Sequence, residues 1–336
     1  MPVPNVEKIR ISKTVALPGD LLSVVCEPNS ERLWIGHIDF KIYSIDFGVE
    51  KPAAAAVFEG HTSYVSGLGL IDGALVSAGW DKKLIWWDLK ERKQIRTVDA
   101  HKLWIRQLSV NPARSTLASV SDDMTCKLWD AKSGQMVRSL TGFDEKLPRY
   151  DYPNKIYACA FSPDGRHVAA ADEACRVIVW ETESGRESAR FDALGFFKAD
   201  WDRNNHPYGG IRSMTFSPDG RSLAMAGMEN TDVAIINGKA LVQSFDWQSG
   251  KKTYEQKLGS NSQFECLYFH PQSAWMLTAV GGSVSGGAMY FLDPAQPKVL
   301  KETLATMPTF ALAVNQTADV IYTVGRGKAI KWDFAA

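Results

Sequence analysis

Residues 77–88 read SAGWDKKLIWWD and residues 119–130 read SVSDDMTCKLWD. Ser77, Asp81 and Trp87 of the first segment each have an identical residue 42 positions later. These later residues are Ser119, Asp123 and Trp129, and the histidines that precede the two segments are His61 and His101. A repeat of roughly 40 to 45 residues that opens on His and closes on Trp-Asp predicts a four-stranded unit in a repeat array.

The two units resemble the repeats of the WD-repeat β-propeller family. The resemblance implies an all-β chain in which each repeat is one blade of a closed ring. We therefore expect residues 1–336 to form a single seven-bladed propeller. The approximate blade bounds are 17–58, 59–99, 100–141, 142–191, 192–257, 258–304 and 305–334, the last together with 6–13.

The two ends of the chain are expected to meet. Residues 6–13 (VEKIRISK) resemble the outer-strand segment at 93–98 (KQIRTV), but no Trp-Asp pair precedes them. Residues 330–333 (IKWD) complete three inner strands of the last unit without an outer one. The N-terminal strand is therefore predicted to complete the last blade, which leaves no free sheet edge inside the ring.

Composition narrows the functional classes. The chain has 38 basic and 38 acidic residues, so its overall charge predicts neither nucleic-acid nor anionic-membrane binding. Its five cysteines are scattered and lack metal-ligand spacing, so we expect free thiols, no metal and no cofactor. Without an apolar run of about 18 residues, the sequence predicts a cytoplasmic protein that is monomeric on its own.

The repeated His, Ser, Asp and Trp residues allow two interpretations. Nucleophile, base and orienting acid together could form a hydrolytic triad. The family resemblance instead implies a buried hydrogen-bonded tetrad inside each blade, with a structural role. The two predicted tetrads are His61, Ser77, Asp81 and Trp87, and His101, Ser119, Asp123 and Trp129. We favour the structural interpretation, because polar groups repeated in adjacent buried sheets need partners and are inaccessible to a substrate.

Long insertions are expected on one side of the ring. The resemblance places two loop classes on a shared edge, here called the top rim: loops from an outer strand to the next inner strand, and hairpins between second and third strands. The insertions at 142–154, 192–210, 229–240 and 281–287 all belong to these classes. Long loops in a compact array usually carry function or are disordered, so the top rim is the candidate site.

The top rim is predicted to bind a protein or peptide through large aromatic and arginine side chains. The candidate residues are Tyr64, Trp80, Trp104, Arg106, Tyr157, Arg212, Phe196, Phe197, Trp201 and Tyr208. Alignment of the first strands also places Phe310 near this rim. Such side chains give a large contact area and planar hydrogen-bond donors. Alternatively, the aromatic residues of 192–210 pack down onto the ring as a separate small core.

We therefore expect a scaffold for protein–protein interaction that is not an enzyme and has no catalytic residue. The alternative is a small-ligand-binding, hydrolytic or lyase propeller with a site in the axial funnel under the 192–210 insertion. A narrower hypothesis is recognition of a methylated lysine by a cage of rings such as Tyr64, Trp80 and Trp104.

Overall fold

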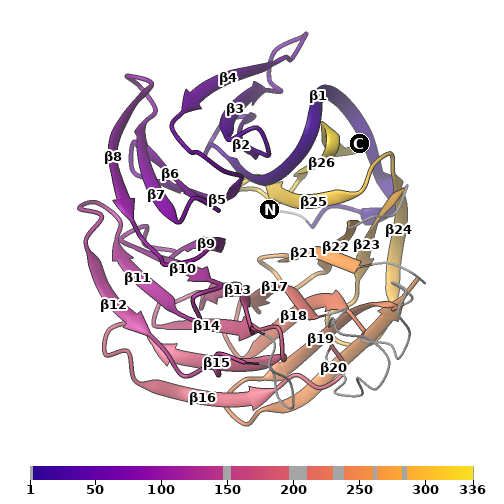
Figure 1. Ribbon diagram of the computed structural model, residues 1–336. Helices are drawn as coiled ribbons and strands as arrows, with labels where there is room; N and C mark the ends of the chain where they lie inside the picture. Colours follow the sequence, from indigo (N-terminus) through magenta and orange to yellow (C-terminus); the bar gives the residue numbers. More distant parts are fainter. Residues whose placement is uncertain are drawn as a thin grey trace.

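The computed structural model describes residues 3–146, 153–196, 210–229, 238–259, 263–281 and 286–335. These residues form β-sheets arranged as a ring around a central opening, which makes the chain an all-β propeller (Figure 1). A 3-10 helix, η1 (Val6–Lys8), precedes the first strand. No helix among the described residues has the length and apolar character needed to cross a bilayer.

Five of the sheets have four antiparallel strands each, which follow one another from the centre of the ring to its outside. The first two consist of β5 (Val65–Ile71), β6 (Ala74–Gly79), β7 (Lys83–Asp88) and β8 (Lys93–Asp99), and of β9 (Ile105–Val110), β10 (Thr116–Ser121), β11 (Cys126–Asp130) and β12 (Met136–Leu140). The next two consist of β13 (Ile156–Phe161), β14 (His167–Asp172), β15 (Arg176–Glu181) and β16 (Glu187–Asp192), and of β17 (Gly210–Phe216), β18 (Ser222–Met228), β19 (Ala240–Asp246) and β20 (Lys251–Leu258). The fifth consists of β21 (Gln263–Phe269), β22 (Met276–Gly281), β23 (Gly287–Leu292) and β24 (Val299–Ala305).

The sixth sheet joins the two ends of the chain. Its order is β25 (Thr309–Val314), β26 (Val320–Phe334), β1 (Ile9–Cys26), β2 (Arg32–His37), β3 (Lys41–Asp46) and β4 (Ala54–Glu59).

The prediction of seven separate blades is wrong, because the strands form six sheets. The reason is that β1 stays extended for 18 residues across the expected boundary between the last and first blades. Its first half pairs with β26, and its second half pairs with β2 from Leu21 onward. A bulge and a glycine with positive φ, Gly19, turn the strand between the two pairings without ending it.

The pairing of the chain ends is observed in this sheet. Ile9 lies opposite Phe334, and the pairing continues to Ala16 opposite Lys328. The segment predicted to be a strand at 6–13 begins as helix η1 instead, and the strand starts at Ile9. Figure 1 shows β1 and β26 side by side, so the backbone groups of β26 that would otherwise form an open edge are paired.

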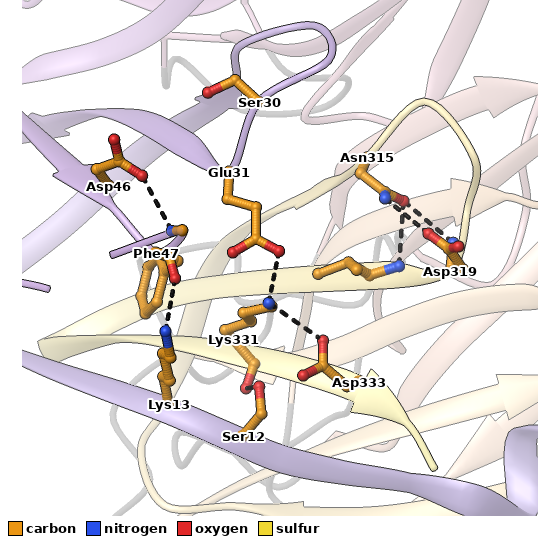
Figure 2. Close-up of polar contacts among 12 residues, drawn as sticks. Ser12, Lys13, Ser30, Glu31, Asp46, Phe47, Asn315, Asp319, Lys331 and Asp333 are labelled. Atoms are coloured by element: carbon orange, nitrogen blue, oxygen red, sulfur yellow. Dashed lines mark hydrogen bonds and ion pairs between the residues drawn. The ribbon is translucent and has the colours of Figure 1, made fainter. Parts of the chain in front are cut away.

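Polar side chains fasten this junction (Figure 2). Lys331 in β26 is buried, and its Nζ lies 2.7 Å from Glu31 Oε1 at the start of β2 and 3.6 Å from Asp333 Oδ1. Lys13 Nζ in β1 donates a hydrogen bond of 2.8 Å to the carbonyl of Phe47. Lys331, near the C-terminal end, therefore binds the segment that follows β1, and Lys13, near the N-terminal end, binds the segment that follows β3.

The hydrophobic core lies between neighbouring sheets. One cluster, for example, packs Val177 and Val179 of β15 against Leu223 of β18 and Leu241 of β19. Each four-stranded sheet is covered on both faces, which explains why strands such as β7 and β15 are apolar without alternation. This packing holds the innermost strands in fixed positions around the centre.

We expect Lys331→Ala to lower the free energy of unfolding by roughly 1 to 3 kcal/mol, because it leaves Glu31 and Asp333 without their cation at the ring junction. Chemical unfolding of the variant and the wild type measures the loss. The control is Lys41→Ala, which removes an exposed ion pair with Glu59. Equal effects of the two substitutions would show that the buried lysine has no special role.

Candidate functional site

The innermost strands share an irregularity at their top ends. The register shifts near the first residues of β5, β9, β13, β17, β21 and β25, and near the start of the β2 pairing in β1, so one residue of each strand bulges out of the ladder. The bulged residues are Leu22, Ser66, Arg106, Tyr157, Arg212, Glu265 and Phe310. A bulge redirects a side chain, and here it directs one from each inner strand to the same place.

These bulged residues, here called the mouth ring, all line one cavity of about 550 Å³ at the centre of the propeller. One side of the ring, Leu22 and Phe310, is apolar, and the side formed by Arg106, Tyr157, Arg212 and Glu265 is polar and charged. Such a mixture of apolar walls and a few placed polar groups is typical of a ligand-binding pocket.

A line of aromatic side chains leads to this cavity along the top rim. Trp80 and Trp104 stack with ring centroids 4.5 Å apart and planes inclined by 5°. Tyr64 lies 4.7 Å from Trp80, and Phe40 lies 6.0 Å from Tyr64, both measured between centroids. These four residues, here called the aromatic strip, come from three adjacent repeats, and Trp104 keeps 43% of its surface exposed.

Arg106 joins the aromatic strip to the mouth ring. Its Nε and Nη2 each donate a hydrogen bond of 2.7 Å to the carboxylate of Asp122. Its Cζ also lies 5.1 Å from the ring centroids of Trp80, Trp104 and Tyr157. Because the bidentate ion pair and three rings hold the guanidinium, Arg106 is a rigid part of the surface.

This arrangement bears on the methyl-lysine hypothesis. Two of the rings proposed for the cage, Trp80 and Trp104, face the chain's own Arg106. Arg106 therefore already supplies the cation that these rings would otherwise take from a ligand.

Arg212 and Glu265 occupy neighbouring positions of the mouth ring without forming an ion pair with any described residue. Arg212 Cζ lies 4.4 Å from the centroid of Tyr157, and its Nε is buried without a hydrogen-bond partner. Glu265 Oε1 accepts a 3.0 Å hydrogen bond from Gln263 Nε2. Burial raises the pKa of Glu265, although Arg212 and Gln263 act in the opposite direction.

A further carboxylate lies close to the two arginines. Glu173 is in the turn between β14 and β15, is almost fully buried, and has an Oε2 without a hydrogen-bond partner. Burial raises its pKa, while the positive charges of Lys155, Arg212 and Arg106 partly oppose that shift. The polar side of the mouth therefore holds charges of both signs.

The repeated His, Ser, Asp and Trp residues form hydrogen-bonded chains inside two sheets. In the first, His61 Nδ1 lies 2.8 Å from Asp81 Oδ2 and His61 Nε2 lies 2.7 Å from Ser77 Oγ. Trp87 Nε1 donates to the same Ser77 Oγ at 2.8 Å. The side chain of His61 has no exposed surface, so a substrate could not reach it.

The second chain has the same geometry. His101 lies 3.0 Å from Asp123 and 2.7 Å from Ser119, and Trp129 donates to Ser119 at 2.8 Å. Burial lowers the pKa of His101, so the ring is neutral and donates through Nδ1. Burial alone would raise the pKa of Asp123, but hydrogen bonds from His101 and Thr125 outweigh it and lower the pKa well below its usual range.

The repeats also match a known family. A model of the WD domain, G-beta repeat, matches residues 54–88, 92–130 and 147–181. The chain therefore contains WD repeats within residues 54–181.

Several WD-repeat relatives align with much of the chain. It is 23% identical over 334 residues to telomerase protein component 1 of Rattus norvegicus, which covers 98% of this chain and 11% of that protein. It is 27% identical over 180 residues to eukaryotic translation initiation factor 3 subunit I of Culex quinquefasciatus, which covers 53% of this chain and 49% of that protein. It is 28% identical over 164 residues to the periodic tryptophan protein 2 homolog of Schizosaccharomyces pombe, which covers 46% and 18%. The chain thus spans less than half the length of these relatives.

The structure brings most of the predicted rim residues together. Tyr64, Trp80 and Trp104 form the aromatic strip with Phe40, and Arg106, Tyr157 and Arg212 belong to the mouth ring. Three residues of the mouth ring were not predicted: Leu22, Ser66 and Glu265. A sequence signal for them exists, because each follows an apolar residue at the start of an inner strand, as Arg106 follows Ile105.

The 192–210 insertion corrects one prediction. Phe196 is fully buried in the core between the β13–β16 and β17–β20 sheets, so it has no surface to offer a partner. It belongs to the same hydrophobic cluster as Leu241 and Val177, so burial of its apolar ring holds it against the sheets. Phe197, Trp201 and Tyr208 lie outside the described residues.

The structure also shows partial substitutes for the tetrad in less regular repeats. In the β13–β16 sheet, Asn154 Nδ2 donates a 2.9 Å hydrogen bond to Asp172 Oδ2, whereas Ala174 occupies the place of the turn aspartate. In the sixth sheet, Trp332 Nε1 donates to Thr323 Oγ1 at 2.9 Å. The prediction missed the first pair because Asp172 belongs to the strand, two positions before the expected turn residue.

We expect Asp123→Ala to lower the free energy of unfolding by roughly 1 to 3 kcal/mol, because His101 and Thr125 lose their acceptor inside the sheet. Asp81→Ala should have a similar effect through His61. Thermal or urea unfolding measures both, with the exposed Asp99→Ala as the control. Unchanged unfolding midpoints in both variants would remove the structural role of the tetrads.

Asp172 should make the stability depend on pH. Burial raises the pKa of Asp172 to about 6, so the folded chain holds a proton that the unfolded chain releases at lower pH. The free energy of unfolding should therefore fall by roughly 2 to 3 kcal/mol as the pH rises from about 4 through about 6. Urea unfolding across this range should show a steeper fall for the wild type than for Asp172→Asn. Parallel curves would contradict this expectation.

Proposed function

We propose that this WD-repeat protein is a non-catalytic scaffold for protein–protein interaction, whose top rim binds a peptide segment or a partner domain. The observation that supports this most is the exposed aromatic strip, which ends on the immobilised guanidinium of Arg106. Stacked tryptophans and a held arginine lose little conformational entropy on binding. The tryptophans offer apolar contact area, and the arginine beside them offers hydrogen-bond donors.

The arrangement of the loops supports the same side of the ring. The strand bounds put the insertions after β12 and β16 in loops that lead to the next innermost strand. The insertions after β18 and β22 are hairpins between second and third strands. By their flanking strands, all four belong to the loop classes of the top rim.

The relatives support an interaction role in their printed names. One is named as a subunit of translation initiation factor 3 and another as a component of telomerase, so both belong to larger assemblies. The balanced charge of the chain favours a protein partner over nucleic acid for the top rim.

The axial cavity supports binding more than catalysis. Among its described lining residues Glu265 is the one carboxyl group, so these residues supply no pair of acids for hydrolysis. The described residues also contain no cluster of His, Cys, Asp and Glu that could hold a metal ion. The histidines of the two tetrads are buried inside their sheets.

We expect Trp104→Ala to abolish or strongly weaken the capture of specific partners, because it removes the exposed end of the aromatic strip. Affinity purification with quantitative mass spectrometry compares the wild type, this variant and Ile95→Ala. Ile95 is 46% exposed on the outer strand β8, so its replacement removes apolar surface outside the top rim. Identical captured proteins for the wild type and Trp104→Ala would contradict the assignment of this rim.

A further inference from the structure

Arg212 and Glu265 are opposite charges on neighbouring innermost strands, and both line the mouth cavity. Arg106, the other arginine of the mouth ring, is neutralised by Asp122. Arg212 and Glu265, in contrast, make no ion pair with each other or with other described residues. The buried Nε of Arg212 has no hydrogen-bond partner, which costs free energy, so Arg212 is the incompletely satisfied group of the pair.

Their own neighbours hold the two charges apart. The guanidinium of Arg212 lies over the ring of Tyr157 at 4.4 Å. Glu265 is held by the side-chain amide of Gln263 and packs over Gly281, where an added Cβ would come within 2.3 Å of Glu265 Cγ. Each side chain is thus held by its own neighbour, and the space between the two groups, here called the gap, is bridged by no ion pair among the described residues.

The charges around this gap favour a neutral ligand group. A cation near Glu265 would face Arg212, and an anion near Arg212 would face Glu265 and the buried Glu173. A carboxamide avoids both repulsions, because its oxygen accepts from a guanidinium while its NH₂ donates to a carboxylate. Phe310, on the strand next to that of Glu265, and Leu22 beyond it offer an apolar wall for the methylene groups of such a side chain.

We propose that the mouth ring binds the side-chain carboxamide of an asparagine or glutamine in the partner peptide, with Arg212 as donor and Glu265 as acceptor. This inference rests on the proposed function, since the peptide that carries the amide lies on the aromatic strip.

Selection from a random-peptide phage library tests this specificity with the protein itself. The wild type should enrich peptides with Asn or Gln at one position near an aromatic or large apolar residue. In a synthetic copy of a selected peptide, replacing that Asn or Gln by Ala should weaken binding roughly 10- to 100-fold, the loss expected for hydrogen bonds to charged groups. Replacing Gln by Glu, or Asn by Asp, should weaken it as well, because Glu265 repels the new charge.

Charge-changing variants complete the test. Arg212→Glu places two carboxylates in the gap and should select Lys or Arg, whereas Glu265→Lys should select Asp or Glu. The control Arg92→Glu changes the net charge equally in the turn before β8, and it should retain the wild-type preference. The peptide substitutions use the wild-type protein, so they remain decisive if a variant does not fold.

Two results would overturn the inference: wild-type selection of charged residues at this position, or a preference that does not change with Arg212 and Glu265. In both, peptides that still lose binding with Trp104→Ala would leave the proposed function intact. If no peptide is enriched, or if enriched peptides bind Trp104→Ala as well as the wild type, the proposed function fails together with the inference.

Discussion

The pairing of β1 with β26 is the constraint on which the rest of the molecule depends. Each sheet of the ring packs against two neighbours, so the core between sheets is complete only when the first and last repeats meet. The backbone ladder and the buried Lys331–Glu31 ion pair close that junction. Because the sheets cannot spread, the innermost strands keep fixed distances from the axis.

Fixed inner strands turn small local irregularities into a binding site. A single bulge directs one side chain away from the ladder, and bulges at equivalent positions around the ring direct several side chains to one cavity. The bulged residues lie outside the ladder pairing, so that pairing does not restrict which side chain stands at each of these positions. Arg106, Tyr157, Arg212 and Glu265 therefore give the cavity its polar chemistry, while the strands that carry them share one architecture.

The buried tetrads and the top rim use polar groups in opposite ways. In the tetrads every strong donor and acceptor finds a partner, as in the bonds of Ser77 with His61 and Trp87, and the groups hold tight turns in place. At the mouth, Arg212 and Glu265 form no ion pair within the described part of the chain, although both are removed from solvent and each acts on the other's charge. Satisfied polar groups stabilise the propeller, and unsatisfied ones are available to a ligand.

The sequence alone determined the propeller class and the two tetrads, because the repeat of Ser77, Asp81 and Trp87 as Ser119, Asp123 and Trp129 is local and regular. The tertiary structure decided the six-sheet count, since only pairing shows that β1 runs through an expected boundary. It also decided that Phe196 is buried, and that residues from distant repeats, such as Arg212 and Glu265, share one cavity. The physical reason is that the burial of a side chain, and the meeting of side chains from distant repeats, depend on how the ring closes. A local pattern of residues carries no information about that closure.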